Sequence, residues 1–300
     1  MLLMISRRST ALTSVILIII VWGSTFVVTK AAVVEIPPIT LSTLRSLIAV
    51  IVLAPIAAAR GGLSGLPRPL PIAPLLLMSL TGIVLFNLGF NYALVYGAAS
   101  QGALIFALVP AAVAVAAVIG LKETLSVRRI AGIALSVCGV ALVVVTGKID
   151  AASPQPLLGA LCMLAAVVAW AVYTVIAKQL ANMDQVIVIA SVSAIGMIMQ
   201  LPLAALELMG APWPAPSLKG WLGVLFLGVI ASAVAFVVYN WALRELDASL
   251  VGVFINLDPV VGVLTAVLVL GETLGIGEAV GGVIAFAGMW LASAERTAER

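Results

Sequence analysis

The sequence predicts an all-α integral membrane protein with ten transmembrane helices, arranged as two inverted five-helix repeats. Three observations predict this fold class. Ten apolar stretches of about twenty residues fill the chain, its second half repeats its first, and basic residues collect in alternate connections. With 64% hydrophobic and 9% charged residues among 300, the chain has too little polar surface to cover a soluble globule.

A helix needs about twenty residues, at 1.5 Å each, to cross a hydrocarbon core of roughly 30 Å. Ten spans are predicted near residues 11–31, 39–59, 72–95, 98–120, 128–146, 155–178, 185–207, 219–242, 247–270 and 276–294. The apolar run over 11–28 is long for the core of a signal peptide, so we expect it to be retained as the first span. Pro37 with Pro38, and Pro154 with Pro156, mark two of the joints between spans.

The duplication can be read directly from the chain. Sliding residues 91–144 forward by 149 positions gives an ungapped match that includes polar residues, proline and glycine. The matched pairs are Asn91 with Asn240, Ala99 and Ser100 with Ala248 and Ser249, Leu108 and Pro110 with Leu257 and Pro259, Glu123, Thr124 and Leu125 with Glu272, Thr273 and Leu274, Gly132 with Gly281, and Gly139 with Gly288. An offset of 148 extends the match to Trp22 with Trp170 and to Lys30 with Lys178.

We therefore expect residues 1–148 and residues 149–300 to form one five-helix repeat each. Because five is odd, the second repeat enters the membrane in the opposite direction to the first. Inverted repeats of this kind are the usual basis of alternating access, in which one half rocks against the other around a site near the midplane.

The positive charges predict that both termini are cytoplasmic. If the N-terminus is inside, the inner connections and ends carry eleven basic residues and the outer ones three. The inner set is Arg7, Arg8, Arg60, Arg68, Lys122, Arg128, Arg129, Lys178, Arg244, Arg296 and Arg300, and the outer set is Lys30, Lys148 and Lys219. Arg45 is expected within the second span, near its outer end.

Asp258 is the ionisable residue that the predicted spans place nearest the bilayer centre, about eleven residues into the span 247–270. A charge there costs roughly 3 kcal/mol on insertion scales, so the side chain is expected to face protein or water. It could be a carboxylate that couples transport to protons or binds an amine, or a hydrogen-bonded residue at a helix kink. Pro110 and Pro259 lie at equivalent midpoints and are expected to be hinges, with packing as the alternative.

Aromatic and amide side chains within the spans are candidates for contact with a substrate. The predicted substrate-binding residues are Trp22, Phe86, Asn87, Phe90, Trp170, Tyr173, Tyr239 and Asn256. Aromatic walls suit a planar or cationic organic solute through stacking and cation–π contact. Packing, interhelical hydrogen bonding and interfacial belts are the alternatives for each of these residues.

Other polar and small residues are interpreted as structural. Glu123 and Glu272 close two spans and are expected to cap the helices that follow them. Gly132, Gly139 and Gly288 lie at spacings that allow helices to approach closely, with a dimer face as the alternative.

Catalysis, cofactors and nucleic acid have little support in the sequence. The chain has no histidine, no pair of carboxylates on one face of a span, no cluster with metal-ligand spacing and no phosphate-binding glycine loop. We therefore expect no enzyme activity, no bound metal and no cofactor. The basic residues stand singly in short connections and form no stripe, so nucleic-acid binding is not expected either.

At these positions the sequence resembles the drug/metabolite transporter superfamily of the EamA type. The resemblance covers nearly the whole chain. It rests on Trp22, Gly23 and Ser24 with Lys30, on Arg45, on Leu108 and Pro110, on Glu123, Thr124 and Leu125, and on Leu257, Asp258, Pro259, Gly271, Glu272, Thr273 and Leu274. It implies a ten-helix inverted-repeat fold with a central cavity that moves small organic metabolites. Trp170 is followed by Ala171 where Trp22 is followed by Gly23, so helix contacts there are expected to differ between the halves.

The chain is also similar to the bacterial aromatic amino acid exporters of this superfamily, of the YddG kind. This likeness implies an inner-membrane secondary transporter that exports amino acids, most of all aromatic ones, by alternating access. A multidrug carrier or a carrier of other metabolites on the same fold is the alternative. The expected partners are a small-molecule substrate and the lipid bilayer, and we expect a monomer, with a dimer as the alternative.

Overall fold

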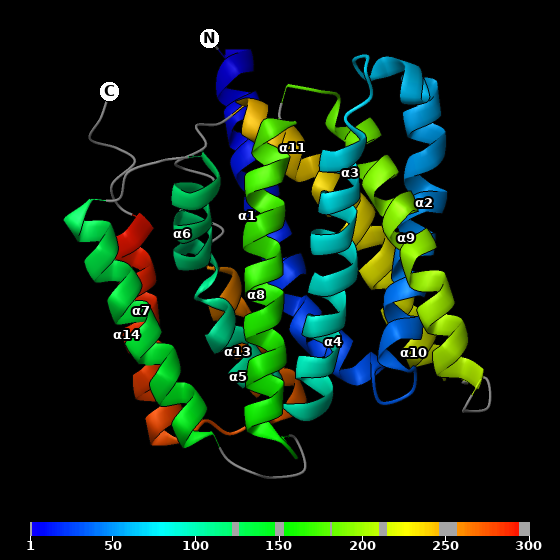
Figure 1. The fold of residues 1–300 in the computed structure, drawn as a ribbon. Helices are drawn as coiled ribbons and strands as arrows, with labels where there is room; N and C mark the ends of the chain where they lie inside the picture. Colours follow the sequence, from blue (N-terminus) through cyan, green and yellow to red (C-terminus); the bar gives the residue numbers. More distant parts are fainter. Residues whose placement is uncertain are drawn as a thin grey trace.

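The structure is a computed structural model that describes residues 2–121, 126–147, 153–180, 182–209, 215–245 and 257–293. Within these ranges all regular structure is helical and there is no β-strand. The helices stand roughly side by side, and α1 begins and α14 ends on the same, upper side of Figure 1.

Eight of the predicted spans are confirmed as helical segments long and apolar enough to cross a membrane. They are α1 (Leu2–Ala32), α2 (Pro38–Ala59), α3 with η2 and α4 (Ile72–Met78, Ser79–Leu85, Phe86–Tyr96), α5 with α6 (Ala99–Phe106, Val109–Leu121), α7 (Val127–Thr146), α8 (Pro156–Gln179), α9 (Gln185–Met209), and α10 with η3 and α11 (Leu218–Leu225, Phe226–Val234, Ala235–Glu245). The last two predicted spans contain the shorter apolar helices α13 (Asp258–Leu270) and α14 (Ile276–Ser293).

The prediction for the ninth span differs most from the structure. It placed Asp258 deep within a continuous helix over 247–270, but Asp258 is the first residue of α13, and Pro259 follows it in the first turn. Proline is well suited to the first turn because the amide it lacks would have no partner inside the helix. Residues 247–256 of this predicted span lie outside the described residues.

The fourth span is also interrupted. Helix α5 ends at Phe106, two residues intervene, and α6 begins at Val109 with Pro110 as its second residue. The carbonyl of Phe106, four residues before Pro110, cannot receive the usual helical hydrogen bond, because proline has no amide hydrogen. The chain tightens instead, and the amides of Ala107 and Leu108 donate to the carbonyls three residues earlier. The hinge role expected for Pro110 stays a prediction.

Two spans contain a π-helical segment near the middle. Segment η2 lies between α3 and α4, and η3 lies between α10 and α11. The sequence offset of 149 pairs the last residue of η2, Leu85, with the last residue of η3, Val234. A π-helical turn leaves a local mismatch in backbone hydrogen bonding, and such turns are frequent at functional sites. The sequence analysis did not foresee either segment.

Helices α7 and α14 pack tightly against each other at one edge of the molecule (Figure 1). A methyl group added at Gly139 would collide with the backbone of Gly281 and Ala285, and one at Gly288 would collide with the backbone of Gly132. The Ser136 hydroxyl donates across the same contact to the carbonyl of Ala285, at 2.8 Å. The prediction that these glycines serve close helix packing is confirmed.

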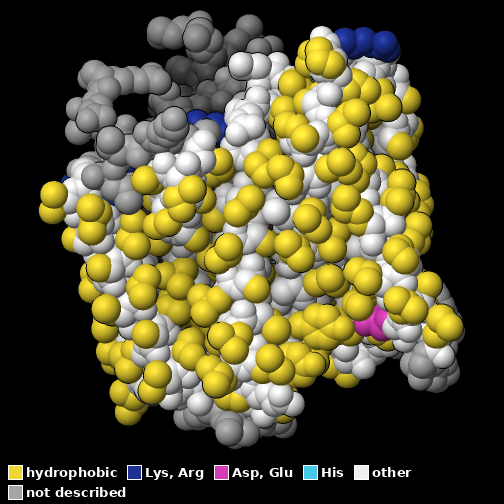
Figure 2. Space-filling model, viewed as in Figure 1, with side chains coloured by type: hydrophobic (Ala, Val, Ile, Leu, Met, Phe, Trp, Pro, Cys, Tyr) yellow, Lys and Arg dark blue, Asp and Glu magenta, His cyan; other side chains and the backbone are white. Residues whose placement is uncertain are grey.

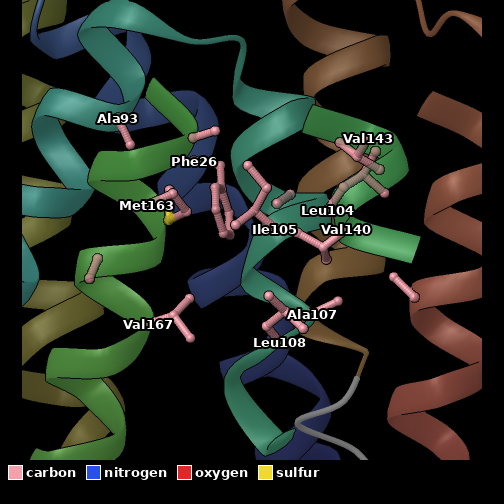
Figure 3. Close-up of a cluster of buried hydrophobic side chains, with 14 of the residues drawn as sticks. Phe26, Ala93, Leu104, Ile105, Ala107, Leu108, Val140, Val143, Met163 and Val167 are labelled. Atoms are coloured by element: carbon pink, nitrogen blue, oxygen red, sulfur yellow. The ribbon is translucent and has the colours of Figure 1, made fainter. Parts of the chain in front are cut away.

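The largest hydrophobic core surrounds the interrupted fourth span. Figure 3 shows Leu104, Ile105, Ala107 and Leu108 at its centre, between Phe26, Met163 and Val167 on one side and Val140 and Val143 on the other. Ile105 and Ala107 are completely inaccessible to solvent. Helices α1, α7 and α8 therefore hold the interruption between α5 and α6 in place from several directions.

The outer surface suits a lipid environment. Large apolar side chains such as Val145, Ile276 and Leu268 are at least 80% exposed. In Figure 2, hydrophobic side chains cover most of the visible face, and Lys and Arg lie only towards its upper edge. An apolar surface of this extent would aggregate in water but is well solvated in a bilayer.

Three glutamates join helices at the lower side of Figure 1. Glu272 accepts hydrogen bonds from the amides of Ala99 and Ser100 and from the Ser100 hydroxyl, at 2.6–2.9 Å. Glu207 does the same at the start of α2, and Glu35 at Ser217, just before α10. Each carboxylate satisfies amides that a helix N-terminus leaves unpaired and lies at the positive end of the helix dipole.

The prediction that Glu272 caps the helix after it is wrong. Its side chain caps α5, more than 170 positions earlier in the sequence, whereas Glu278 accepts a local hydrogen bond from the amide of Gly275, at 2.7 Å. Local spacing cannot reveal a partner so distant in sequence. Glu123, the counterpart of Glu272, lies outside the described residues.

We predict that Glu272→Ala lowers the free energy of unfolding by about 2–3 kcal/mol, because it leaves two buried amides without acceptors. SDS titration of the purified protein in mixed micelles measures the change. Glu278→Ala is the matched control, with a smaller expected loss because it removes one local hydrogen bond. An unfolding midpoint for Glu272→Ala equal to that of the wild type would contradict this account.

Candidate functional site

Aromatic rings from both halves of the chain meet near the centre of the helical bundle. The Trp22 indole on α1 donates to the carbonyl of Ala231 in η3, at 3.0 Å. Its ring lies 5.6 Å from that of Phe236 and 5.4 Å from that of Tyr239, measured between centroids. The hydrogen bond fixes the orientation of an indole that would otherwise bury an unpaired N–H group.

A second group of rings adjoins the first. The Trp170 ring on α8 lies 4.8 Å from Phe86 of α4 and 4.9 Å from Tyr173, with which it stacks. Trp170 also approaches Phe236, at 6.4 Å, and so connects the two groups. The Tyr173 ring packs directly against Gly82 of η2, where any larger residue would collide with it.

Further rings extend these two groups towards the interruption between α5 and α6. Phe90 lies 5.7 Å from Phe86 and 4.9 Å from Phe26, and Phe26 lies 5.7 Å from Phe106, the last residue of α5. We call the connected rings the aromatic cluster; its members are Trp22, Phe26, Phe86, Phe90, Phe106, Trp170, Tyr173, Phe236 and Tyr239. Six of the predicted substrate-binding residues lie in it.

The predicted amides are distributed differently. Asn87 is buried on α4, beside the aromatic cluster, and its Nδ2 donates to the carbonyl of Ile83 at 2.8 Å. Asn91 donates to the carbonyl of Pro38, at 2.8 Å, and so joins α4 to the start of α2. Asn256 lies outside the described residues, so its predicted contact with substrate stays a prediction.

Arg45 on α2 contacts residues of η3 and α4. Its Nε donates to the Ser232 hydroxyl in η3, at 2.7 Å, and its Nη1 donates to Oδ1 of Asn87, at 3.2 Å. The sequence analysis placed Arg45 near the end of a span and did not include it among the site residues. An arginine about two turns inside an apolar span was the available signal, because charge at that depth is costly unless it is used.

Asp258 lies where α13 crosses α1. A methyl group at Gly23 would be 2.6 Å from Cβ of Val261 and 3.0 Å from the carbonyl oxygen of Asp258, so glycine is what permits this close crossing. The Asp258 side chain is buried, and its Oδ1 has no hydrogen-bond partner within the described part of the chain. A carboxyl oxygen buried in this way costs free energy unless a proton or a ligand satisfies it.

The described residues include no group of three or more His, Cys, Asp or Glu side chains able to hold a metal ion. What they contain is the aromatic cluster, a guanidinium hydrogen-bonded to Asn87 and Ser232, and a buried carboxyl group where α13 crosses α1. Such a set can hold a solute by stacking, hydrogen bonding and charge.

Comparison with known proteins identifies the family. The EamA-like transporter family matches the chain twice, over residues 9–145 and over residues 157–294. A crystal structure of a protein 23% identical in sequence has the same fold, with a TM-score of 0.64, and the match covers 95% of this chain and 97% of that one.

Two curated relatives extend the comparison. "Uncharacterized transporter YetK" of Bacillus subtilis is 28% identical over 270 residues, which cover 87% of this chain and 82% of that protein. "Probable terminal-alkyne amino-acid exporter" of Streptantibioticus cattleyicolor is 26% identical over 286 residues, which cover 95% of this chain and 94% of that protein. The family match extends over both halves, and this chain therefore belongs to the EamA-like transporter family of multi-pass membrane proteins.

Proposed function

We propose that the protein is a secondary transporter of the bacterial inner membrane that exports small organic metabolites, foremost aromatic amino acids, by alternating access. The observation that carries this proposal is the aromatic cluster, which joins α1, α4 and α5 of the first half to α8 and α11 of the second. A planar solute among these rings would contact both halves and respond to their relative movement.

Two five-helix inverted repeats, residues 1–148 and 149–300, are part of the proposal. The double family match, the sequence offset of 149 and the paired π-helical segments support them. The interruption before Pro110 would let the first half bend there, and Pro259 in the first turn of α13 would let the second half bend there, which is the hinge role expected for both prolines.

The amino acid substrate is supported by chemistry and by one relative. The printed name of the Streptantibioticus cattleyicolor protein describes a probable amino-acid exporter. Rings in the aromatic cluster suit an aromatic side chain, and the Arg45 guanidinium suits a carboxylate. The eleven-to-three distribution of basic residues supports an inner-membrane orientation with both termini cytoplasmic.

A carrier of cationic drugs or other metabolites is the second candidate. Buried Asp258 and the indole rings favour it, since cations bind both carboxylates and aromatic faces. The guanidinium of Arg45, which is hydrogen-bonded to Asn87 next to Phe86 in sequence, disfavours it, because like charges repel.

Uptake of labelled L-phenylalanine into proteoliposomes tests the proposal, with unlabelled competitors and an imposed pH gradient. Saturable uptake that other aromatic amino acids inhibit would support it. Inhibition only by cationic drugs would favour the second candidate, and non-saturable flux would indicate a channel.

We predict that Trp170→Leu raises KM for phenylalanine about two- to tenfold, because it removes one aromatic stacking partner of roughly 0.5–1.5 kcal/mol. Trp290→Leu on α14 is the matched control, since that side chain is 64% exposed and lies outside the aromatic cluster. Equal KM values for the two variants would exclude Trp170 from substrate binding.

We predict that Asp258→Asn inserts normally but no longer responds to the pH gradient, because an amide neither binds nor releases a proton in this range. Initial uptake rates with and without the gradient measure the effect. Glu278→Gln, the same acid-to-amide change outside the site, should keep the wild-type response. An unaltered response of Asp258→Asn at every pH would remove this residue from coupling.

A further inference from the structure

Arg45 is a cation inside the membrane-spanning part of the fold. It lies about two turns into α2, at a depth of roughly 10 Å from the start of the helix. On insertion scales, an arginine near the centre of a span costs about 2.5–3.5 kcal/mol of insertion free energy. Residues of this kind normally pair with an opposite charge or take part in function.

The hydrogen-bond partners of Arg45 do not neutralise its charge. Asn87 and Ser232 are both neutral, and the ion pair found among the described residues joins Arg60 to Asp184 instead. A guanidinium has five N–H groups, and these two bonds use two of them. The other three, on Nη1 and Nη2, have no acceptor within the described part of the chain, and the Arg45 side chain is partly exposed.

The two partners are themselves held in position. Asn87 donates its amide hydrogen to the carbonyl of Ile83, which turns its Oδ1 towards Arg45. The Ser232 hydroxyl donates to the carbonyl of Leu227, five residues earlier in the π-helical segment, and so presents its oxygen to Nε. With Nε occupied, the Nη1 and Nη2 end of the guanidinium is left for a ligand, in the planar arrangement that suits a carboxylate.

Both partners are next in sequence to residues that contact or belong to the aromatic cluster. Asn87 follows Phe86, whose ring contacts Trp170, and Ser232 follows Ala231, whose carbonyl accepts the indole hydrogen of Trp22. Arg45 has no counterpart in the second half of the chain: offsets of 148 and 149 lead to Ser193 and Ala194. The positive charge therefore lies in one half of the chain only.

From these observations we propose that Arg45 binds the carboxylate of the transported amino acid through Nη1 and Nη2. This inference rests on the proposed amino acid export. It assigns the two ends of the substrate, with the side chain against the aromatic cluster and the carboxylate against α2.

The test compares two ligands that differ only at the carboxyl group, L-phenylalanine and L-phenylalaninamide. Kd values are measured by isothermal titration calorimetry on purified, monodisperse protein. We expect the wild type to prefer the acid by about ten- to a hundredfold, as for a hydrogen bond to a charged group. Arg45→Gln should bind the acid more weakly by about the same factor and bind the amide within about twofold of the wild type.

Arg60→Gln is the matched control, because Arg60 lies beyond the end of α2, is 45% exposed and pairs with Asp184. It should keep the full preference for the acid. Ser232→Ala leaves the charge in place and releases Nε, and is expected to reduce the preference about threefold. It serves as the second variant if Arg45→Gln does not fold.

The inference would be overturned if Arg45→Gln or Ser232→Ala kept the wild-type preference for the acid. It would also be overturned if Arg45→Gln lost affinity for the acid and for the amide by the same factor, because that result indicates a structural role. Failure of the proposed function gives a different result: the wild type itself then binds neither ligand, or binds the amide more tightly than the acid. The two failures are therefore distinguishable in one set of titrations.

Discussion

The constraint on which this structure depends is that backbone amides and carbonyls in hydrocarbon must find partners within the protein. An unpaired group in that environment costs several kcal/mol, so a membrane span is expected to be a continuous helix. This protein interrupts a helix at the junction of α5 and α6, begins α13 at Asp258 inside the predicted ninth span, and changes helical geometry in η2 and η3. The junction of α5 and α6 is enclosed by the largest hydrophobic core, and η2 and η3 each contact the aromatic cluster, through Gly82 and the Ala231 carbonyl. Their outer faces carry exposed apolar side chains such as Leu85 and Val234.

Side chains satisfy the same constraint at the helix ends. Glu35, Glu207 and Glu272 supply acceptors for the first amides of other helices, and Lys30 donates to the carbonyls of Leu94 and Gly97 at the end of α4. Each of these charges lies at the end of the helix dipole that favours it. These four ionisable residues thus serve to join helices, and their hydrogen-bonding groups are used within the protein.

Hydropathy and sequence duplication predicted the eight long membrane-spanning segments to within a few residues, and glycine spacing predicted the contact between α7 and α14. Both signals depend on local composition or on regular spacing along the chain, so they can be read from one sequence. The partner of Glu272 and the position of Arg45 depend on which helices are neighbours and on how each helix is rotated. Hydropathy gives the depth of Arg45 along α2, but not the direction in which its side chain points, and so the residue was left out of the predicted site.

The duplication also separates scaffold from site. Elements that shape the fold occur twice in the sequence: Pro110 with Pro259, Gly139 with Gly288, and Glu123 with Glu272. The charged residues beside the centre do not, since the counterpart of Asp258 is Val109. A carrier that alternates between two related states needs its hinges and packing in both halves, because each half takes the role of the other. Under the proposed function the substrate carries one carboxylate, so a complementary cation such as Arg45 is required only once, and a second copy would bury a charge without a partner.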